Sequence, residues 1–172
     1  MKTNIKHISI IGAFIAISMI FSYIESMVPS FIPLPGAKLG LANIVNLLAL
    51  FIFGPLEAFI IGAFRVFLSA LMFGNMISFF MSLSGFLLSY FIMLILYRTK
   101  KFSVPGISLA GGAFHNVGQL ICASVYMGNS GILSYMFLFV VFGVITGLII
   151  GFLGKMIYET VKTYDWISER NS

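Results

Sequence analysis

The sequence predicts an all-α integral membrane protein with six transmembrane helices, and two observations lead to that fold class. The 172-residue chain is 60% hydrophobic and only 9% charged, with a mean hydropathy of +1.08, which is typical of membrane proteins. Its apolar residues run continuously without the alternation of barrel strands, and this argues against a transmembrane β-barrel. Five acids and ten bases are too few to cover a soluble bundle. The length predicts a single membrane domain over residues 1–172.

Six apolar segments follow one another along the chain, and each predicts one helix. They cover about residues 8–28, 39–53, 56–73, 76–97, 107–127 and 131–158. The first is too long for a signal peptide and lacks a clear cleavage site, so we expect it to be retained. The second is short for a full crossing, and one interpretation is that it begins in the loop before it. Gly54 then breaks the chain, and Pro55 suits the first turn of the third helix.

The later helices are separated by short turns. Gly74 and Asn75 form the predicted turn after the third helix, and a Gly-Asn-Ser-Gly run at 128–131 precedes the sixth. The fifth segment is the least hydrophobic of the six and carries three glycines. We expect the tail after Tyr158 to lie at the cytoplasmic surface.

Basic residues predict how these helices cross the membrane. With six crossings, nearly all of them fall on one side, namely Lys2, Lys6, Arg98, Lys100, Lys101, Lys155, Lys162 and Arg170. The positive-inside rule makes that side cytoplasmic, so both termini are predicted in the cytoplasm and the protein in the cell membrane. The net charge of +5 is thereby explained by topology, and it does not indicate nucleic-acid binding.

The outer connection over residues 26–40 is longer than its neighbours and contains three prolines. Proline restricts its own backbone and that of the preceding residue, so this stretch is predicted to be stiff and non-helical. A long loop at the mouth of a bundle is a candidate lid. The alternative is a plain tether between the first two helices.

Arg65 lies about midway along the third segment. A guanidinium group stays protonated, and a charge at bilayer depth is costly unless it faces a partner or a wet cavity. Glu57 is eight residues away, about 12 Å along a helix, so it does not pair with Arg65 directly. Glu25, near the outer end of the first helix, is a candidate partner. Arg65 therefore either braces the bundle through Glu25 or backbone carbonyls, or binds an anionic or carbonyl-bearing ligand.

Amide and imidazole side chains gather on two other segments. Asn43 and Asn46 are three residues apart and share one helix face, where they either bind a ligand or clamp neighbouring helices. His115, Asn116 and Gln119 lie within five positions of the fifth segment, beside glycines that permit close backbone approach. Three such groups favour the lining of a polar cavity over a set of separate structural hydrogen bonds.

Other features of the sequence limit the function. Gly12, Ala13 and Ala16 place small residues on the first helix, which suits close approach of another helix inside the protein or from a membrane partner. There is no nucleotide-binding Walker motif and no metal-ligand cluster, so no metal or cofactor is predicted. Prenyl diphosphate chemistry uses aspartate-rich motifs, whereas this chain has the single aspartate Asp165. The single cysteine, Cys122, is interpreted as a small core residue.

Several motifs together resemble one family. They are the stretch at 33–46, which includes KLGLAN at 38–43, and the segments at 54–58, 65–68, 73–74 and 112–119, the last reading GAFHNVGQ. These segments are similar to the Gx transporter family, which is also labelled heptaprenyl diphosphate synthase component I. The resemblance covers most of the chain.

The resemblance implies a fold similar to the substrate-binding S components of energy-coupling factor (ECF) vitamin transporters of the bacterial plasma membrane. Such a subunit captures substrate from outside, and a separate ECF transmembrane subunit and ATPase subunits supply the energy. By this resemblance Gly12, Ala13 and Ala16 dock the partner, and the 26–40 loop is the lid. The ligand is then a small anionic or polar-headed metabolite of unknown identity. The expected substrate-binding residues are Lys38, Asn43, Asn46, Arg65, His115, Asn116 and Gln119.

Two other functions stay open at this stage. The chain is alternatively a non-catalytic membrane subunit that supports an isoprenoid or quinone pathway, or a membrane redox complex. A membrane enzyme that uses His115 is the least favoured of the three. We therefore predict that the chain is not itself an enzyme.

Overall fold

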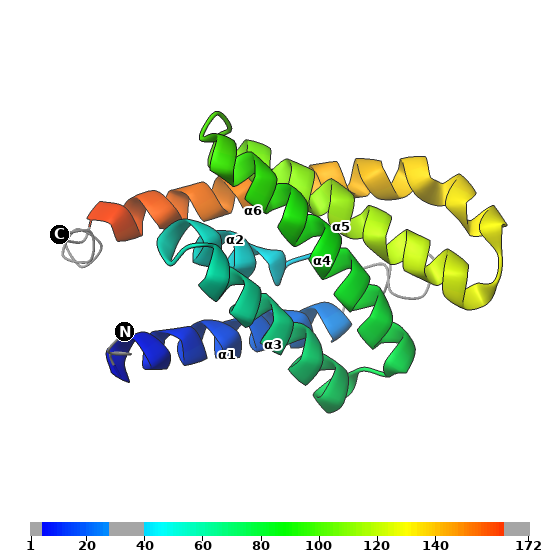
Figure 1. Cartoon of the computed structure of the whole chain (residues 1–172), viewed down its shortest axis with the longest axis horizontal. Coiled ribbons are helices and arrows are strands. Elements are labelled where there is room, and N and C mark those ends of the chain that lie inside the picture. Colours follow the sequence, from blue (N-terminus) through cyan, green and yellow to red (C-terminus); the bar gives the residue numbers. More distant parts are fainter. Residues whose placement is uncertain (1–4, 28–39, 164–172) are drawn as a thin grey trace.

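A computed structural model describes residues 5–27 and 40–163 of the chain (Figure 1). Over these ranges the secondary structure is helical and contains no strand. The helices are α1 (Ile5–Met27), α2 (Asn43–Ile52), α3 (Pro55–Phe73), α4 (Met76–Thr99), α5 (Val104–Met127), the 3₁₀ turn η1 (Ser130–Tyr135) and α6 (Met136–Thr163). The predicted all-α class and the six helices are therefore confirmed. The expected lid and Lys38 lie outside the described residues, apart from the ends of the 26–40 stretch.

Not every helix meets the requirements for a membrane crossing. Four described segments are long and apolar enough, namely α1, α3, α4 and the continuous stretch from η1 through α6. The 10 residues of α2 rise only about 15 Å, half of the hydrocarbon thickness. The 24 residues of α5 have the length but are less apolar. Membrane character is thus supported, whereas six full crossings and the cytoplasmic position of both termini stay predictions.

Local sequence explains where the helices begin and end. Gly54 has a φ of +107°, a conformation that glycine tolerates, and Pro55 follows as the first residue of α3. Asn75 precedes α4, and its side chain accepts a hydrogen bond of 2.8 Å from the amide of Ser78. Gly128 ends α5 with a φ of +60°. These breaks coincide with the turns that the sequence indicates.

The helices run back and forth between two ends of the bundle (Figure 1). The start of α1, the turn between α2 and α3 and the end of α6 lie at one end, whereas the turns after α3 and α5 lie at the other. At the first end His7 and Glu57 approach to 3.5 Å. This pair joins α1 to α3 and leaves Glu57 far from Arg65, as the helical rise predicts.

The helices α4, α5 and α6 form a closely packed unit in which glycines face backbone. A Cβ added at Gly112 would lie 2.3 Å from the carbonyl oxygen of Gly143, and one at Gly118 would lie 2.7 Å from that of Ser84. Only glycine permits such approach between helices. We call α4–α6 the glycine-packed unit.

The helices α1, α2 and α3 form the other unit, and they meet mainly through side chains. Leu47 and Leu50 of α2 and Ile61 of α3 are fully buried within the same apolar cluster. α1 differs from them, because the residues that it buries are Ser18, Ser22 and Glu25. We call α1–α3 the outer unit.

Candidate functional site

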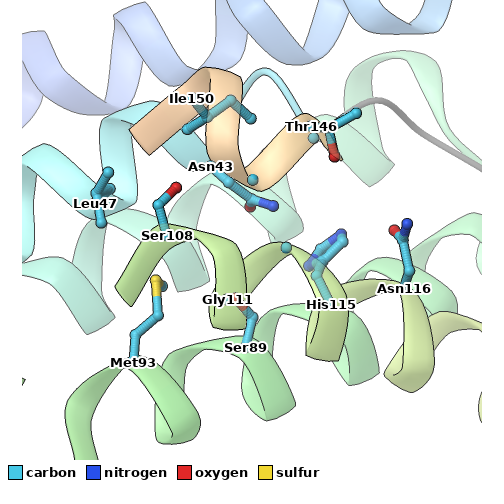
Figure 2. A pocket seen from close by; sticks show the side chains of 13 residues that line it. Asn43, Leu47, Ser89, Met93, Ser108, Gly111, His115, Asn116, Thr146 and Ile150 are labelled. Carbon is cyan, nitrogen blue, oxygen red and sulfur yellow. The ribbon is translucent and has the colours of Figure 1, made fainter. Parts of the chain in front are cut away.

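A small cavity lies where α2, α4, α5 and α6 converge (Figure 2). Its polar lining comes from Asn43, Ser89, Ser108, His115, Asn116 and Thr146. Asn43 and His115 point into the space between α2, α5 and α6. The cavity measures about 10 Å³, which is room for one water molecule rather than for a metabolite.

Glycines create the space around this cavity and fix its walls. Gly111 and Gly112 of α5 and Gly147 of α6 belong to its lining. A Cβ at Gly111 would lie 2.6 Å from the sulfur of Met93, so even one methyl group would disturb the wall. The cavity is therefore bounded on one side by the glycine-packed unit.

Asn116 is predicted to bind substrate, but the structure gives it a different contact. Its side-chain amide donates a hydrogen bond of 3.0 Å to the carbonyl oxygen of Phe139 on α6. Both partners are buried, and such a bond joins two helices without any ligand. Asn116 lines the cavity and at the same time fastens α5 to α6.

Three other predicted residues are buried outside this lining and carry polar atoms without partners. Asn46, Arg65 and Gln119 are 2%, 7% and 0% exposed. Within the described part of the chain, no hydrogen bond reaches Oδ1 of Asn46, Nε and Nη2 of Arg65, or either side-chain polar atom of Gln119. Buried polar atoms are normally bonded, and each that is not destabilises the fold by about 1–3 kcal/mol.

Close contacts with two glycines position the amide groups. A Cβ at Gly62 of α3 would lie 2.7 Å from the side-chain nitrogen of Asn46, and Gly62 is one helical turn before Arg65. On the other side, a Cβ at Gly85 of α4 would lie 2.9 Å from Cγ of Gln119. Asn46, Arg65 and Gln119 thus come from three helices and face the interior.

Arg65 lies in the field of one buried acid. Glu25 of α1 interacts electrostatically with Arg65, and its carboxylate accepts a hydrogen bond from the backbone amide of Gly40. Glu25 therefore connects α1 to the residues just before α2. Glu25 therefore supports the interpretation in which Arg65 braces the bundle, although Nε and Nη2 of Arg65 have no hydrogen bond among the described residues.

The polar face of α1 was not predicted from the sequence, although Glu25 on it was a candidate partner of Arg65. Ser18 and Ser22 lie four residues apart and Glu25 follows three later, which places all of them on one face. That face is buried, whereas apolar residues such as Ile17, Ile20 and Ile24 are exposed. The i, i+4, i+7 spacing of polar residues in an otherwise apolar helix is the signal that would have found it.

The remaining candidates of the sequence analysis fall elsewhere. Gly12, Ala13 and Ala16 are exposed on α1, and no atom lies within 4 Å of a Cβ built at Gly12. Partner docking there stays a prediction. Cys122 is half-buried. Among residues 5–27 and 40–163, His, Cys, Asp and Glu form no group of three that could hold a metal ion.

Comparison with known proteins gives one match. The sequence model of a family described as heptaprenyl diphosphate synthase component I matches residues 4–157 of the 172. No curated protein and no solved structure gives a significant match.

Proposed function

The chain belongs to the heptaprenyl diphosphate synthase component I family, and from this premise we propose that it is a substrate-capturing membrane subunit. In this proposal it is the S component of an ECF-type uptake transporter. Its cargo is a small vitamin-like or cofactor-precursor metabolite, which it holds inside the helix bundle. The protein lies in the bacterial plasma membrane with both termini in the cytoplasm.

The observation that carries the proposal is the set of buried, unbonded polar atoms on Asn46, Arg65 and Gln119. A purely structural bundle gains nothing from three such groups, because each destabilises the empty protein. A ligand that hydrogen-bonds to them recovers this free energy on binding. Residues of this kind at bilayer depth therefore favour binding over a scaffold role.

The size of the cavity sets a condition on capture. About 10 Å³ accommodates a water molecule but no vitamin-like molecule. In this proposal, a ligand of that size enters the bundle only if helices separate. The outer unit is the part that moves in this proposal, because glycine-to-backbone contacts hold α4, α5 and α6 together.

The energising partners are proposed to be an ECF transmembrane subunit and ATPase subunits. Gly12, Ala13 and Ala16 offer an exposed stretch of small residues on α1 for that contact.

Native mass spectrometry of the purified subunit tests the proposal. The wild-type protein is expected to retain a small molecule of defined mass, and Arg65→Ala and Gln119→Leu are expected to lose it. Lys155→Ala is the matched control, because Lys155 is exposed on α6 and, among the described residues, forms an ion pair with Glu159 at 3.6 Å. An adduct that is equally present in all four proteins contradicts the assigned site.

A second function is favoured by the family description itself, which names a component of a synthase. In that case the chain is a non-catalytic membrane subunit that supports an isoprenoid or quinone pathway or a membrane redox complex. Affinity purification in mild detergent separates the two functions. Copurifying ATPase subunits support transport, whereas a prenyl synthase or redox subunits support the second role.

A further inference from the structure

The cavity between α2, α4, α5 and α6 is lined by side chains of both units. Asn43 comes from the outer unit, whereas Ser89 and Ser108 come from the glycine-packed unit. The volume of about 10 Å³ is near the lower limit at which a cavity holds one water molecule. Apolar cavities of this size stay dry, so the polarity of the lining decides whether water enters.

Two hydroxyl groups of the lining are deeply buried. Ser89 and Ser108 are 2% and 5% exposed. A serine in a helix often bonds to a preceding carbonyl group, as Ser84 does with the carbonyl oxygen of Met81 at 3.0 Å. Neither Ser89 nor Ser108 takes part in a hydrogen bond among the residues that the structure describes. Each hydroxyl therefore keeps one donor and its acceptor lone pairs for a molecule in the cavity.

The opposite wall is supplied by Asn43, the first residue of α2. Its side chain points into the space between α2, α5 and α6 (Figure 2). The amide has one acceptor oxygen and a donor nitrogen, and within the described ranges no hydrogen bond joins it to the two serines across the cavity. Asn43 is thus a third polar group that a molecule in the cavity satisfies.

The remaining lining adds acceptors without adding a full charge. Asn116 donates its side-chain nitrogen to Phe139 at 3.0 Å, and the hydroxyl of Thr146 donates to the carbonyl oxygen of Phe142 at 2.9 Å. The side-chain oxygens of Asn116 and Thr146 still have lone pairs. The described lining includes no lysine, arginine, aspartate or glutamate, which favours a neutral molecule over an ion.

We propose that this cavity binds one ordered water molecule, which bridges Asn43 of the outer unit to Ser89 and Ser108 of the glycine-packed unit. Because the space is about the size of one water, a molecule inside it is within reach of the groups that line it. A buried water makes about three hydrogen bonds, and a bridging water is nearly as favourable in enthalpy as a direct bond. The water fastens α2 to the glycine-packed unit, and this role does not depend on the proposed capture function.

Hydroxyl-radical footprinting tests the water site, because irradiation converts a bound water into a radical that oxidises the side chains beside it. Met93 lines the cavity and is 4% exposed, whereas Met81 of the same helix is 3% exposed and is not part of this lining. Bulk solvent reaches both thioethers equally little, so Met81 is the matched control. In the purified wild type, conversion of Met93 to the sulfoxide is expected to be severalfold faster than that of Met81.

Substitutions assign the oxidation to the proposed bridge. The combination of Asn43→Leu, Ser89→Ala and Ser108→Ala removes all three bridging groups, and the cavity is expected to lose its water. The oxidation rate of Met93 should then fall to that of Met81. Should this variant fail to fold, the comparison of Met93 with Met81 in the wild type still decides.

Ser78→Ala is the control substitution on α4. Ser78 lies outside the lining, and its bond to Asn75 uses the backbone amide, which alanine keeps. The rate of Met93 is expected to stay at the wild-type value. Equal rates of Met93 and Met81 in the wild type overturn the inference. A folded triple variant in which Met93 is still oxidised at the wild-type rate overturns it as well.

Discussion

The glycine-packed unit and the outer unit use opposite means to hold their helices together. In α4–α6 the backbones touch, as where Gly112 faces Gly143, and the polar side chain of Asn116 is bonded across the interface. In α1–α3 the helices meet through side chains, and Ser22, Asn46 and Arg65 all bury atoms that no hydrogen bond reaches among residues 5–27 and 40–163. The glycine-packed unit brings its backbones into contact and bonds Asn116 across the interface, with Gln119 as its exception, whereas the outer unit buries several polar atoms that no hydrogen bond reaches among the described residues.

This difference separates stability from function within one small bundle. Close backbone contact resists displacement, so the glycine-packed unit is suited to be a fixed wall. Unsatisfied buried groups lower the stability of the empty protein, and such groups persist at sites where a ligand supplies the missing bonds. Gln119 is the exception within the glycine-packed unit, since it lies on α5 and no hydrogen bond reaches its side chain among the described residues.

The largest effect is expected from adding a methyl group to the glycine-packed unit. The Cβ of Gly112→Ala would lie 2.3 Å from the backbone oxygen of Gly143, and backbone cannot rotate away as a side chain can. We expect a loss of about 3 kcal/mol in the free energy of unfolding. Chemical denaturation in detergent micelles measures it.

The control is the same substitution where space is open. A Cβ at Gly12 in α1 would contact nothing within 4 Å, so Gly12→Ala is expected to stabilise the helix by up to about 1 kcal/mol. Equal effects of the two substitutions would show that the close contacts of α5 with α6 do not hold the unit together.

The next largest effect concerns the buried charges of the outer unit. Because Glu25 acts electrostatically on Arg65, the substitutions Glu25→Gln and Arg65→Met are expected to be non-additive. We expect a coupling energy of about 2 kcal/mol from a double-mutant cycle of unfolding free energies. Additivity within about 0.5 kcal/mol would remove Glu25 as the partner of Arg65.

Much of the fold follows from the sequence, because it depends on local signals. Gly54, Pro55 and Asn75 act on the residues beside them, so the helix ends could be predicted to within a few residues. The exact start of α2 is less local, since Gly40, just before the helix, donates its amide to Glu25, fifteen residues away. Six helices and the shortness of the second one were predictable, whereas the start of α2 at Asn43 rather than near residue 39 required the structure.

The candidate site was only partly predictable for a related reason. An arginine or an amide in an apolar helix signals burial, and Asn46, Arg65, His115 and Gln119 are indeed buried. Which of them have partners depends on how helices pack. Asn116 and Gln119 look alike in the sequence, yet only Asn116 meets a carbonyl oxygen.

The smallest effect is expected from these two residues of α5, and the two substitutions are expected to change the stability in opposite directions. Gln119→Met replaces two unbonded polar atoms by an apolar chain of similar shape, so we expect it to stabilise the empty protein by about 1 kcal/mol. Asn116→Leu removes the bond of 3.0 Å to Phe139 and leaves its buried carbonyl oxygen unbonded, so we expect a loss of similar size. Thermal unfolding of both variants measures the two shifts under one condition.

Opposite signs would mean that α5 carries one amide for stability and one for binding. The stabilised variant should then retain less of any copurifying small molecule than the wild type, because the gain comes from removing the groups that a ligand would satisfy. If Gln119→Met instead destabilises the protein, its amide has partners in the folded state. The glycine-packed unit would then be satisfied at this position as well, and the assignment of Gln119 to a ligand-binding site would fail.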